Sequence, residues 1–477
     1  MKKLLAILAL MSALSMSGLG LVSAAHADEV KTDAVATVVA DAAVAPDAAA
    51  PAAETAAPAE ATAEAPATID VGSTAWMIMA TILVILMIIP GLALFYGGLV
   101  RSKNMLSVAM QVFVSFSLVS IIWAVYGYSL AFTEGNNFIG GLSKAFLNGV
   151  TSNSINGVIP EYVFIVFQMT FAGITPALII GGFAERAKFS AVMLFLVFWV
   201  TLVYIPIAHM VWGGGLLSDA GPLFNGVGAK DFAGGTVVHI NAGIAALVGA
   251  LVIGKRIGFG REAMAPHSMV MTMIGAALLW VGWFGFNVGS ELAVDGISSL
   301  ALINTQLATA AAVFGWVAAE WLIKGKPSML GAASGAVAGL VAITPACGFI
   351  GPLGSIVLGF VASFVSLWAV SSLKNALSYD DSLDVFGIHG IAGIIGAIAT
   401  GLLMAPEFGG VGYAEGVTMA QQVKTQATAV CVTIVWTGII SYILFKVIDA
   451  VIGLRVTDEQ EREGLDTAEH GERAYHM

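Results

Sequence analysis

The stretch His239-Ile-Asn-Ala-Gly-Ile244 recurs later in the chain as His389-Gly-Ile-Ala-Gly-Ile394. Each copy opens an apolar run. An ionisable group is costly inside a hydrophobic segment of a membrane chain, so its repetition at matched positions indicates a functional site. In transporters built from two related halves, such sites lie near the middle of the membrane, where the halves meet. The two segments therefore predict a pore or carrier for a small polar or cationic solute, with His239 and His389 lining its centre.

The composition excludes an ordinary soluble domain. Of the 477 residues, 58% are hydrophobic and 11% are charged, and apolar runs of about twenty residues, enough to span a bilayer, repeat along the chain. The net charge of -11 reflects acids crowded at the two polar ends, and it argues against nucleic-acid binding, which needs a basic face. The sequence has neither a phosphate-binding loop nor a cysteine cluster, so we expect no enzyme activity, no cofactor and no metal.

The first 72 residues precede the expected membrane domain. Lys2, Lys3, the apolar run 4–22 and the small residues before position 28 predict a signal peptide over residues 1–27. An uncleaved first helix is the alternative. Residues 28–72 consist mainly of Ala, Pro, Thr and acids, with no aromatic residue. They cannot bury enough apolar surface to fold, so we expect a disordered periplasmic arm.

Eleven apolar segments follow, each long enough to cross a bilayer as a helix. Their expected bounds are 74–100, 105–132, 161–183, 189–212, 235–254, 268–290, 297–322, 328–347, 351–373, 385–404 and 426–452. Lys and Arg concentrate in the odd-numbered loops, which marks those loops as cytoplasmic. We therefore expect an all-α, multi-pass inner-membrane domain over residues 73–453, a periplasmic mature N-terminus and a cytoplasmic C-terminal tail over 454–477.

Five spans lie on each side of residues 255–267. Because five is an odd number, the two halves, each with one histidine segment, run in opposite directions across the membrane. The Ile-Thr-Pro-Ala sequence at 174–177 in span three and at 343–346 in span eight is a second, weaker repeat. Together these features predict an inverted repeat of five plus five spans with an added eleventh helix. About 24 Å of helix separates each histidine from one end of its span, so straight helices that end at the membrane faces would keep the two histidines apart. The two therefore meet only if residues 232–238 and 385–388 form partly non-helical lead-in segments within the membrane.

The histidines and nearby acids are the first candidates for chemistry. Neutral imidazole has one donor and one acceptor, so His239 and His389 can pass a proton or hold a polar solute; two core histidines bonded between helices are the alternative. Asp231, eight residues before His239, either strengthens the field on a cation or caps the next helix, and we favour capping. Asp384 has the matching position before His389 and the same expected role. His209 has no repeat partner and is interpreted as a packing residue.

A second group of candidates combines aromatic rings with a hydroxyl. Trp212 and Ser290 end spans four and six on the predicted outer side, and Phe286 lies one turn deeper than Ser290 on the same face. Aromatic faces attract a small cation, a hydroxyl adds directional selectivity, and stacked rings such as Phe171 and Phe286 reject hydrated ions. On composition alone, packing or anchoring at the membrane interface is the better explanation for the aromatic residues.

Five longer motifs carry more information than any single residue. They are Pro90-Gly-Leu-Ala-Leu-Phe-Tyr-Gly-Gly98, Tyr204–Gly215, Asp231–Asn241, Trp283–Ser290 and Asp384–Gly390. From about Ala75 to its C-terminus the sequence resembles the Amt/Mep/Rh ammonium transporter family, and within it the proteobacterial channels with a PII-regulated tail. The chain departs from the family pattern in its long arm and in a longer loop over 218–230.

The resemblance implies a role for each candidate. The implied roles are an outer ammonium recruitment site (Trp212, Phe171, Ser290), a stacked gate (Phe171, Phe286), a hydrophobic pore (His239, His389) and structural support of the recruitment site (Asp231). The implied mechanism recruits ammonium, deprotonates it and conducts ammonia with the proton inward, because a charged ion is very costly in a dry pore. The implied assembly is a homotrimer in membrane lipid, with a PII signal protein bound at the cytoplasmic tail.

Two other functions fit the same sequence. One is an ammonium sensor that binds its ligand and signals through the tail with little flux. The other is an ion-coupled carrier for a different small solute, such as urea or a neutral amine.

Overall fold

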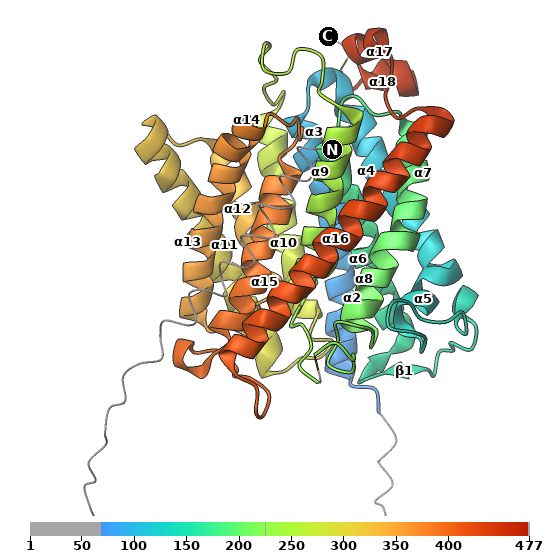
Figure 1. Cartoon of the computed structure of the whole chain (residues 1–477), viewed down its shortest axis with the longest axis vertical. Coiled ribbons are helices and arrows are strands. Elements are labelled where there is room, and N and C mark those ends of the chain that lie inside the picture. Colours follow the sequence, from blue (N-terminus) through green and yellow to red (C-terminus); the bar gives the residue numbers. More distant parts are fainter. Residues whose placement is uncertain (1–67, 225, 476–477) are drawn as a thin grey trace, which may run out of the picture.

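The computed structural model describes residues 68–224 and 226–475. The predicted signal peptide and all but the last five residues of the predicted arm lie outside the described residues. The described chain forms a helical bundle that α16 (Met419–Ile452) crosses obliquely, with α17 (Asp458–Glu463) and α18 (Leu465–His470) lying across one end (Figure 1). We call this end the tail face. The small antiparallel pair of β1 (Ile155–Asn156) and β2 (Ile159–Pro160) lies at the opposite face.

Several long helices contain short 3₁₀ or π-helical turns, which carry the label η. Up to residue 253 the helical elements are α2 (Val71–Leu86), η2 (Met87–Leu92), α3 (Ala93–Leu99), η3 (Ser102–Asn104), α4 (Met105–Ile122), η4 (Trp123–Gly127), α5 (Tyr128–Phe132), η5 (Ala145–Leu147), α6 (Glu161–Ile179), η6 (Ile180–Gly182), α7 (Phe189–Trp199), η7 (Val200–Tyr204), α8 (Ile205–Trp212), η8 (Gly235–Ile240) and α9 (Asn241–Ile253). Beyond it they are α10 (Met269–Gly289), α11 (Gly296–Lys324), α12 (Met329–Ile343), α13 (Pro352–Trp368), η9 (Ala369–Leu373), α14 (Lys374–Leu377), η10 (Phe386–Ile391), α15 (Ala392–Leu403), η11 (Pro406–Phe408) and α16 (Met419–Ile452).

The described helices confirm the predicted all-α membrane architecture. Ten continuous helical stretches are long and apolar enough to cross a bilayer, and α12 is an eleventh, shorter apolar helix. The prediction for this eighth span, 328–347, is too long. The 15 residues of α12 rise about 22 Å, and the helix ends at Ile343, two residues before Pro345, which has no N–H to continue the hydrogen-bond ladder. In α6, by contrast, Pro176 lies inside the helix, so the two Ile-Thr-Pro-Ala sequences are not structural equals.

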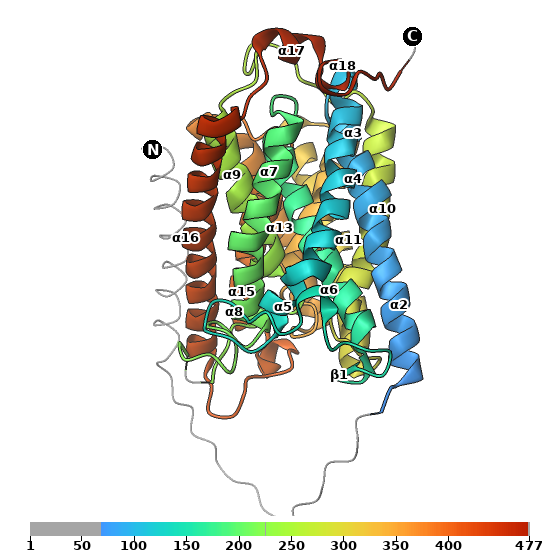
Figure 2. The same cartoon turned by 90° about the vertical axis from the view of Figure 1, so that its right-hand side faces the viewer.

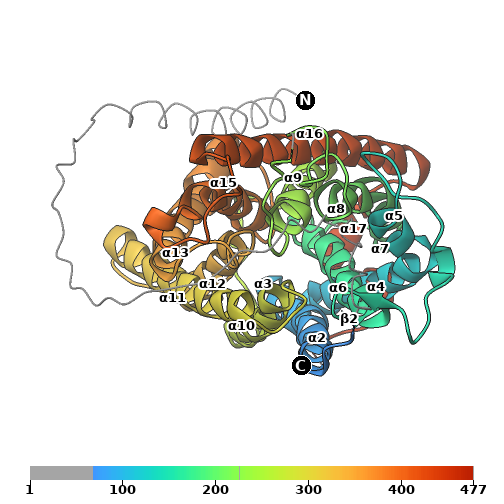
Figure 3. The same ribbon diagram turned by 90° about the horizontal axis from the view of Figure 1, so that it is seen from below.

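The two halves share an unusual local feature. π-Helical turns occur in span four (η7) and span nine (η9), and again in span five (η8) and span ten (η10). Viewed along the bundle, spans from both halves lie side by side around its centre (Figure 3). These four turns recur at positions that a five-plus-five repeat pairs with each other, whereas the π-helical turns of spans one (η2) and two (η4) have no counterpart in α10 and α11. π-Helical turns are frequent at functional sites.

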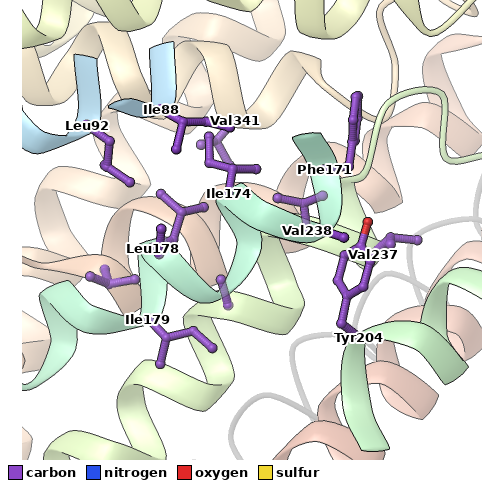
Figure 4. Packing of buried hydrophobic residues seen from close by; sticks show 14 of the residues in the cluster. Ile88, Leu92, Phe171, Ile174, Leu178, Ile179, Tyr204, Val237, Val238 and Val341 are labelled. Carbon is purple, nitrogen blue, oxygen red and sulfur yellow. The ribbon is translucent and has the colours of Figure 1, made fainter. Parts of the chain in front are cut away.

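The middle of α6 is packed from several sides by apolar residues. Figure 4 shows Phe171, Ile174 and Leu178 of α6 near side chains of η2, η8 and α12. Phe171 is 1% exposed and Ile174 is also buried. Because this packing fixes α6 against the histidine-bearing η8, it fixes where Phe171 lies relative to His239.

A buried ion cluster joins the loops at the tail face. The Arg256 guanidinium lies 2.9 Å from a Glu185 oxygen and 2.7 Å from an Asp380 oxygen, and Arg101 binds Glu185 at 3.0 Å. Burial raises the pKa of Glu185, but the charges of Arg256 and Arg101 outweigh it, so this pKa lies below its ordinary value. The loops that follow α3, η6, α9 and α14 are thereby held together.

The tail lies across one end of the bundle (Figure 2), and its own carboxylates bond it there. Asp466 accepts hydrogen bonds from the backbone N–H groups of Leu106 (3.1 Å) and Ser107 (2.7 Å), in the first turn of α4. Glu469 accepts one from the N–H of Phe189, the first residue of α7, at 2.9 Å. Two long helices thus have their N-terminal N–H groups satisfied by acids at the far end of the sequence.

Candidate functional site

The two repeated histidines meet in the middle of the bundle. The Nδ1 atoms of His239 and His389 lie 3.3 Å apart, and their ring centroids lie 5.4 Å apart. Both side chains are buried, with exposed fractions of 1% and 4%. Since each nitrogen must act as donor or acceptor according to its proton, this contact requires one ring to donate and the other to accept.

Glycines in the repeated motif allow this approach. A Cβ on Gly243 would lie 2.3 Å from the backbone N of Gly390, and one on Gly393 would lie 3.2 Å from the Cβ of His239. Gly243 follows His239 by four residues, and Gly393 follows His389 by four residues, so each glycine lies one turn along the same face as its histidine. The pattern His-x-x-Ala-Gly therefore encodes both the imidazole and the backbone contact that brings the second imidazole to it.

The lead-in segments differ from the expectation. Residues 232–234 are irregular and end at Gly234, whose φ is 113°, but η8 begins at Gly235. Helical geometry begins at Val385, directly after Asp384 with a φ of 61°, so the predicted non-helical 385–388 segment is wrong. Each histidine lies in a π-helical turn, within four residues of the point where its helix begins.

A continuous row of aromatic rings leads to His239. Trp212 packs edge-on against Phe171 with centroids 6.0 Å apart, and Phe171 stacks on Phe286 at 4.0 Å with an interplanar angle of 12°. The Phe286 ring lies 6.0 Å from the His239 ring. The predicted aromatic residues from spans three, four and six are therefore brought together with the histidine pair.

Two cavities end on either side of this row. The larger, about 700 Å³, opens at the face opposite the tail and is lined by Phe171, Trp212, Ser290 and Asp231, among others. The smaller, about 200 Å³, lies on the tail side and reaches His389. Between them lie buried side chains that are mostly apolar.

Asp231 is bonded to the start of η8. Its carboxylate accepts hydrogen bonds from the backbone N–H groups of Gly234 (3.0 Å), Gly235 (2.5 Å), Thr236 (2.8 Å) and Val237 (3.2 Å), and from the Thr236 hydroxyl. Burial raises the pKa of Asp231, and these hydrogen bonds act in the opposite direction. The geometry is that of a helix cap.

Asp231 also positions the aromatic row through its backbone. Its carbonyl oxygen accepts a hydrogen bond from Trp212 Nε1 at 2.9 Å. The cap of η8 and the orientation of the outermost ring are thus linked by one residue.

In the second half, the matching cap comes from a different acid. Asp381 accepts a hydrogen bond from the Phe386 N–H at 2.7 Å, at the start of η10. Asp384, the expected counterpart of Asp231, instead forms an ion pair with Lys374 at 2.6 Å. Burial raises the pKa of Asp381 to about 6. The spacing could have separated the two acids, because Asp381 precedes His389 by eight residues, as Asp231 precedes His239, whereas Asp384 precedes it by five.

Trp283 is a site residue that the sequence analysis did not single out. Its ring stacks on His239 with centroids 5.3 Å apart, and its Nε1 donates to the Thr344 hydroxyl at 2.9 Å. The spacing could have identified it, since Trp283 precedes Phe286 by three residues and shares its helix face. His209 lies away from this row and bonds the carbonyl oxygens of Ala131 and Asn136, both at 2.9 Å, as a packing histidine would.

Comparisons with known proteins agree on one family. The model described as the Ammonium Transporter Family matches residues 75–475. An ammonium transporter of Bacillus subtilis is 49% identical over 410 residues, covering 85% of this chain and 99% of the relative. One from Aquifex aeolicus is 46% identical over 417 residues, covering 86% and 95%.

Solved structures of the same kind share the fold. The crystal structure of Candida albicans Mep2 has a TM-score of 0.74 at 34% identity, covering 82% of this chain and 88% of that one. A structure described as a sensor Amt protein has a TM-score of 0.77 at 29% identity, covering 83% and 98%.

Removing the Asp231 carboxylate should destabilise the fold. Asp231→Ala leaves the start of η8 without its acceptor, so we expect a loss of roughly 2 kcal/mol or more, seen as a lower midpoint of thermal unfolding in detergent. Asp231→Asn keeps one oxygen acceptor, so its midpoint of thermal unfolding should fall between those of wild type and Asp231→Ala. The exposed N-cap Asp295 is the control, because water can replace its side chain in Asp295→Ala. Equal midpoints for wild type and Asp231→Ala would contradict the capping role.

Proposed function

The chain belongs to the ammonium transporter family, a family of transporters rather than enzymes, and from that premise we propose that it takes up ammonium along the row from Trp212 to His389. The observation that carries the proposal is the alignment of an outer aromatic cavity, a stacked phenylalanine pair and two bonded imidazoles in one line.

We propose that Trp212, Phe171 and Ser290 bind ammonium in the outer cavity. The indole and phenyl faces offer negative quadrupole density to a small cation, and the Ser290 hydroxyl keeps a free lone pair while it donates to the Phe286 carbonyl at 2.9 Å. Phe171 and Phe286 then form the gate. Because their rings stack at 4.0 Å, a hydrated ion cannot pass without displacing them.

Beyond the gate, the proposed solute is ammonia, with the proton conducted separately. An ammonium ion would lose its hydration shell among buried apolar side chains, which is far more costly than moving a neutral molecule. The His239–His389 pair offers both a donor and an acceptor, so it can hold ammonia by hydrogen bonds or exchange a proton with it. Asp231 supports the site by fixing η8 and Trp212.

The wider setting is proposed on the same grounds. The cavity with Trp212 faces the periplasm and the tail face lies in the cytoplasm, in the inner membrane, as the loop charges predict. The assembly is a homotrimer in lipid, and the tail over residues 454–477 binds a PII signal protein that inhibits uptake.

An ammonium sensor is the second candidate, because one structurally similar protein is described as a sensor. Purified protein in liposomes separates the two functions. A current or internal pH change after an ammonium gradient supports transport, and ligand binding without either supports sensing.

Replacing both pore histidines tests the centre of the proposal. We expect His239→Ala combined with His389→Ala to lower selective ammonium uptake by at least tenfold while the purified protein keeps its elution volume, because the donor–acceptor pair is lost. Methylammonium uptake into liposomes is the measurement. Selective uptake at the wild-type rate would contradict the role of the imidazoles.

Replacing Trp212 tests the outer site. Trp212→Leu keeps apolar volume but removes the π face. The half-saturating methylammonium concentration should rise roughly tenfold, which corresponds to the loss of about 1.4 kcal/mol of cation–π attraction. Phe349→Leu, also in the cavity lining but outside the proposed row, is the control. An unchanged concentration dependence in Trp212→Leu would remove it from the site.

Shortening the tail tests the proposed regulation. A chain that ends at Arg455 should still conduct ammonium, but a PII protein added at the cytoplasmic face should no longer inhibit it. Uptake is compared with and without PII for the full and shortened chains. Inhibition that persists in the shortened chain would place the PII contact elsewhere.

A further inference from the structure

An ion pair lies at the rim of the outer cavity. The Lys230 ammonium bonds both carboxylate oxygens of Asp219, at 2.8 and 2.9 Å. Both residues line the cavity that also contains Trp212 and Ser290. The Asp219 side chain is 64% exposed, whereas that of Lys230 is 22% exposed. The carboxylate thus faces water at the mouth, and the lysine covers it from within.

The backbone on both sides of this pair is fixed. The Lys230 N–H donates to Gln426 Oε1 at 2.7 Å, and its carbonyl accepts from Gln426 Nε2 at 2.8 Å, which ties it to α16. Asp219 accepts from the Gly228 N–H at 2.8 Å. The Lys230 backbone and the Asp219 carboxylate are therefore each held by a contact outside the ion pair.

Few other charges act in this cavity. Among the lining residues that the structure describes, the charged side chains are Asp219, Lys230 and Asp231. The Asp231 carboxylate is buried and bound to the start of η8. Asp219 and Lys230 are therefore the charged side chains at the rim of the cavity that an entering ammonium ion meets first.

We propose that the Asp219–Lys230 pair sets how strongly the outer cavity attracts ammonium. The Asp219 carboxylate attracts the cation, and the Lys230 ammonium group offsets that attraction. The inference rests on the proposed function of this cavity as the ammonium entrance. A charge of one sign in a cleft with apolar walls raises the local concentration of the opposite ion, and salt screens the effect. Because its two charges cancel, the pair itself adds little net charge to the entrance, and ammonium binding depends on the aromatic faces.

An ion pair whose only role is to hold the loop between residues 219 and 230 would behave differently. Removing either partner of such a structural pair would disturb the loop and shift the half-saturating concentration in the same direction. The electrostatic role predicts opposite effects, because Lys230→Gln leaves the cavity more negative and Asp219→Asn leaves it more positive. The double variant is nearly neutral again.

The experiment measures methylammonium uptake against concentration, using the full-length purified protein in liposomes at about 20 mM and about 500 mM NaCl. At low salt we expect Lys230→Gln to lower the half-saturating concentration about two- to fivefold and Asp219→Asn to raise it by a similar factor. The double variant should return to within about twofold of wild type. All differences should shrink at high salt.

Two controls separate charge from structure. Lys230→Arg keeps the charge and should retain the wild-type value. Lys424→Gln removes an exposed lysine near the start of α16 that does not line the cavity, and it should also retain that value. Shifts of the same sign in both single variants, persistence of the shifts at high salt, or no shift at all would overturn the inference.

The proposed function fails separately. Absence of methylammonium uptake by the wild-type protein would contradict the transport function itself, and with it the inference. Uptake by wild type with unshifted variants would contradict only the role of the ion pair.

Discussion

The architecture depends on one close backbone contact between the two halves of the chain. Gly243 and Gly390 lie so near each other that a methyl group on Gly243 would overlap the backbone of Gly390. Only at that separation can two imidazoles on crossing helices reach 3.3 Å. The packing around η8 and η10, the caps at Asp231 and Asp381 and the π-helical turns all serve to hold this crossing at depth in the bundle.

The same crossing links the outer aromatic residues to the centre. Asp231 holds the first turn of η8 through its carboxylate and Trp212 through its carbonyl. A movement of η8 would therefore shift His239 and the outermost ring together. The stacked pair of Phe171 and Phe286 lies between them, so the proposed recruitment site, gate and pore share one rigid frame.

Much of this was readable from the sequence, and the reasons are specific. The number of apolar spans followed from hydrophobic length, and the meeting of His239 with His389 followed from their repeat within oppositely directed halves. The roles of the aromatic residues came only from family resemblance, because Trp and Phe are common in any membrane helix. The π-helical turns escaped prediction, since they depend on three-dimensional packing that no local pattern records. The early end of α12, two residues before Pro345, and the capping role of Asp381, which precedes His389 by eight residues as Asp231 precedes His239, were missed although the sequence carries both signals. Trp283 was missed although its spacing to Phe286 placed it on the same face.

The bonds from the tail to α4 and α7 also bear on biosynthesis. Leu106, Ser107 and Phe189 are synthesised hundreds of residues before Asp466 and Glu469, which bind their N–H groups. During translation these helix starts must be hydrated or bound by something else until Asp466 and Glu469 have left the ribosome. These contacts at the tail face therefore form late in the maturation of the protein, after the helices that they cap have been made.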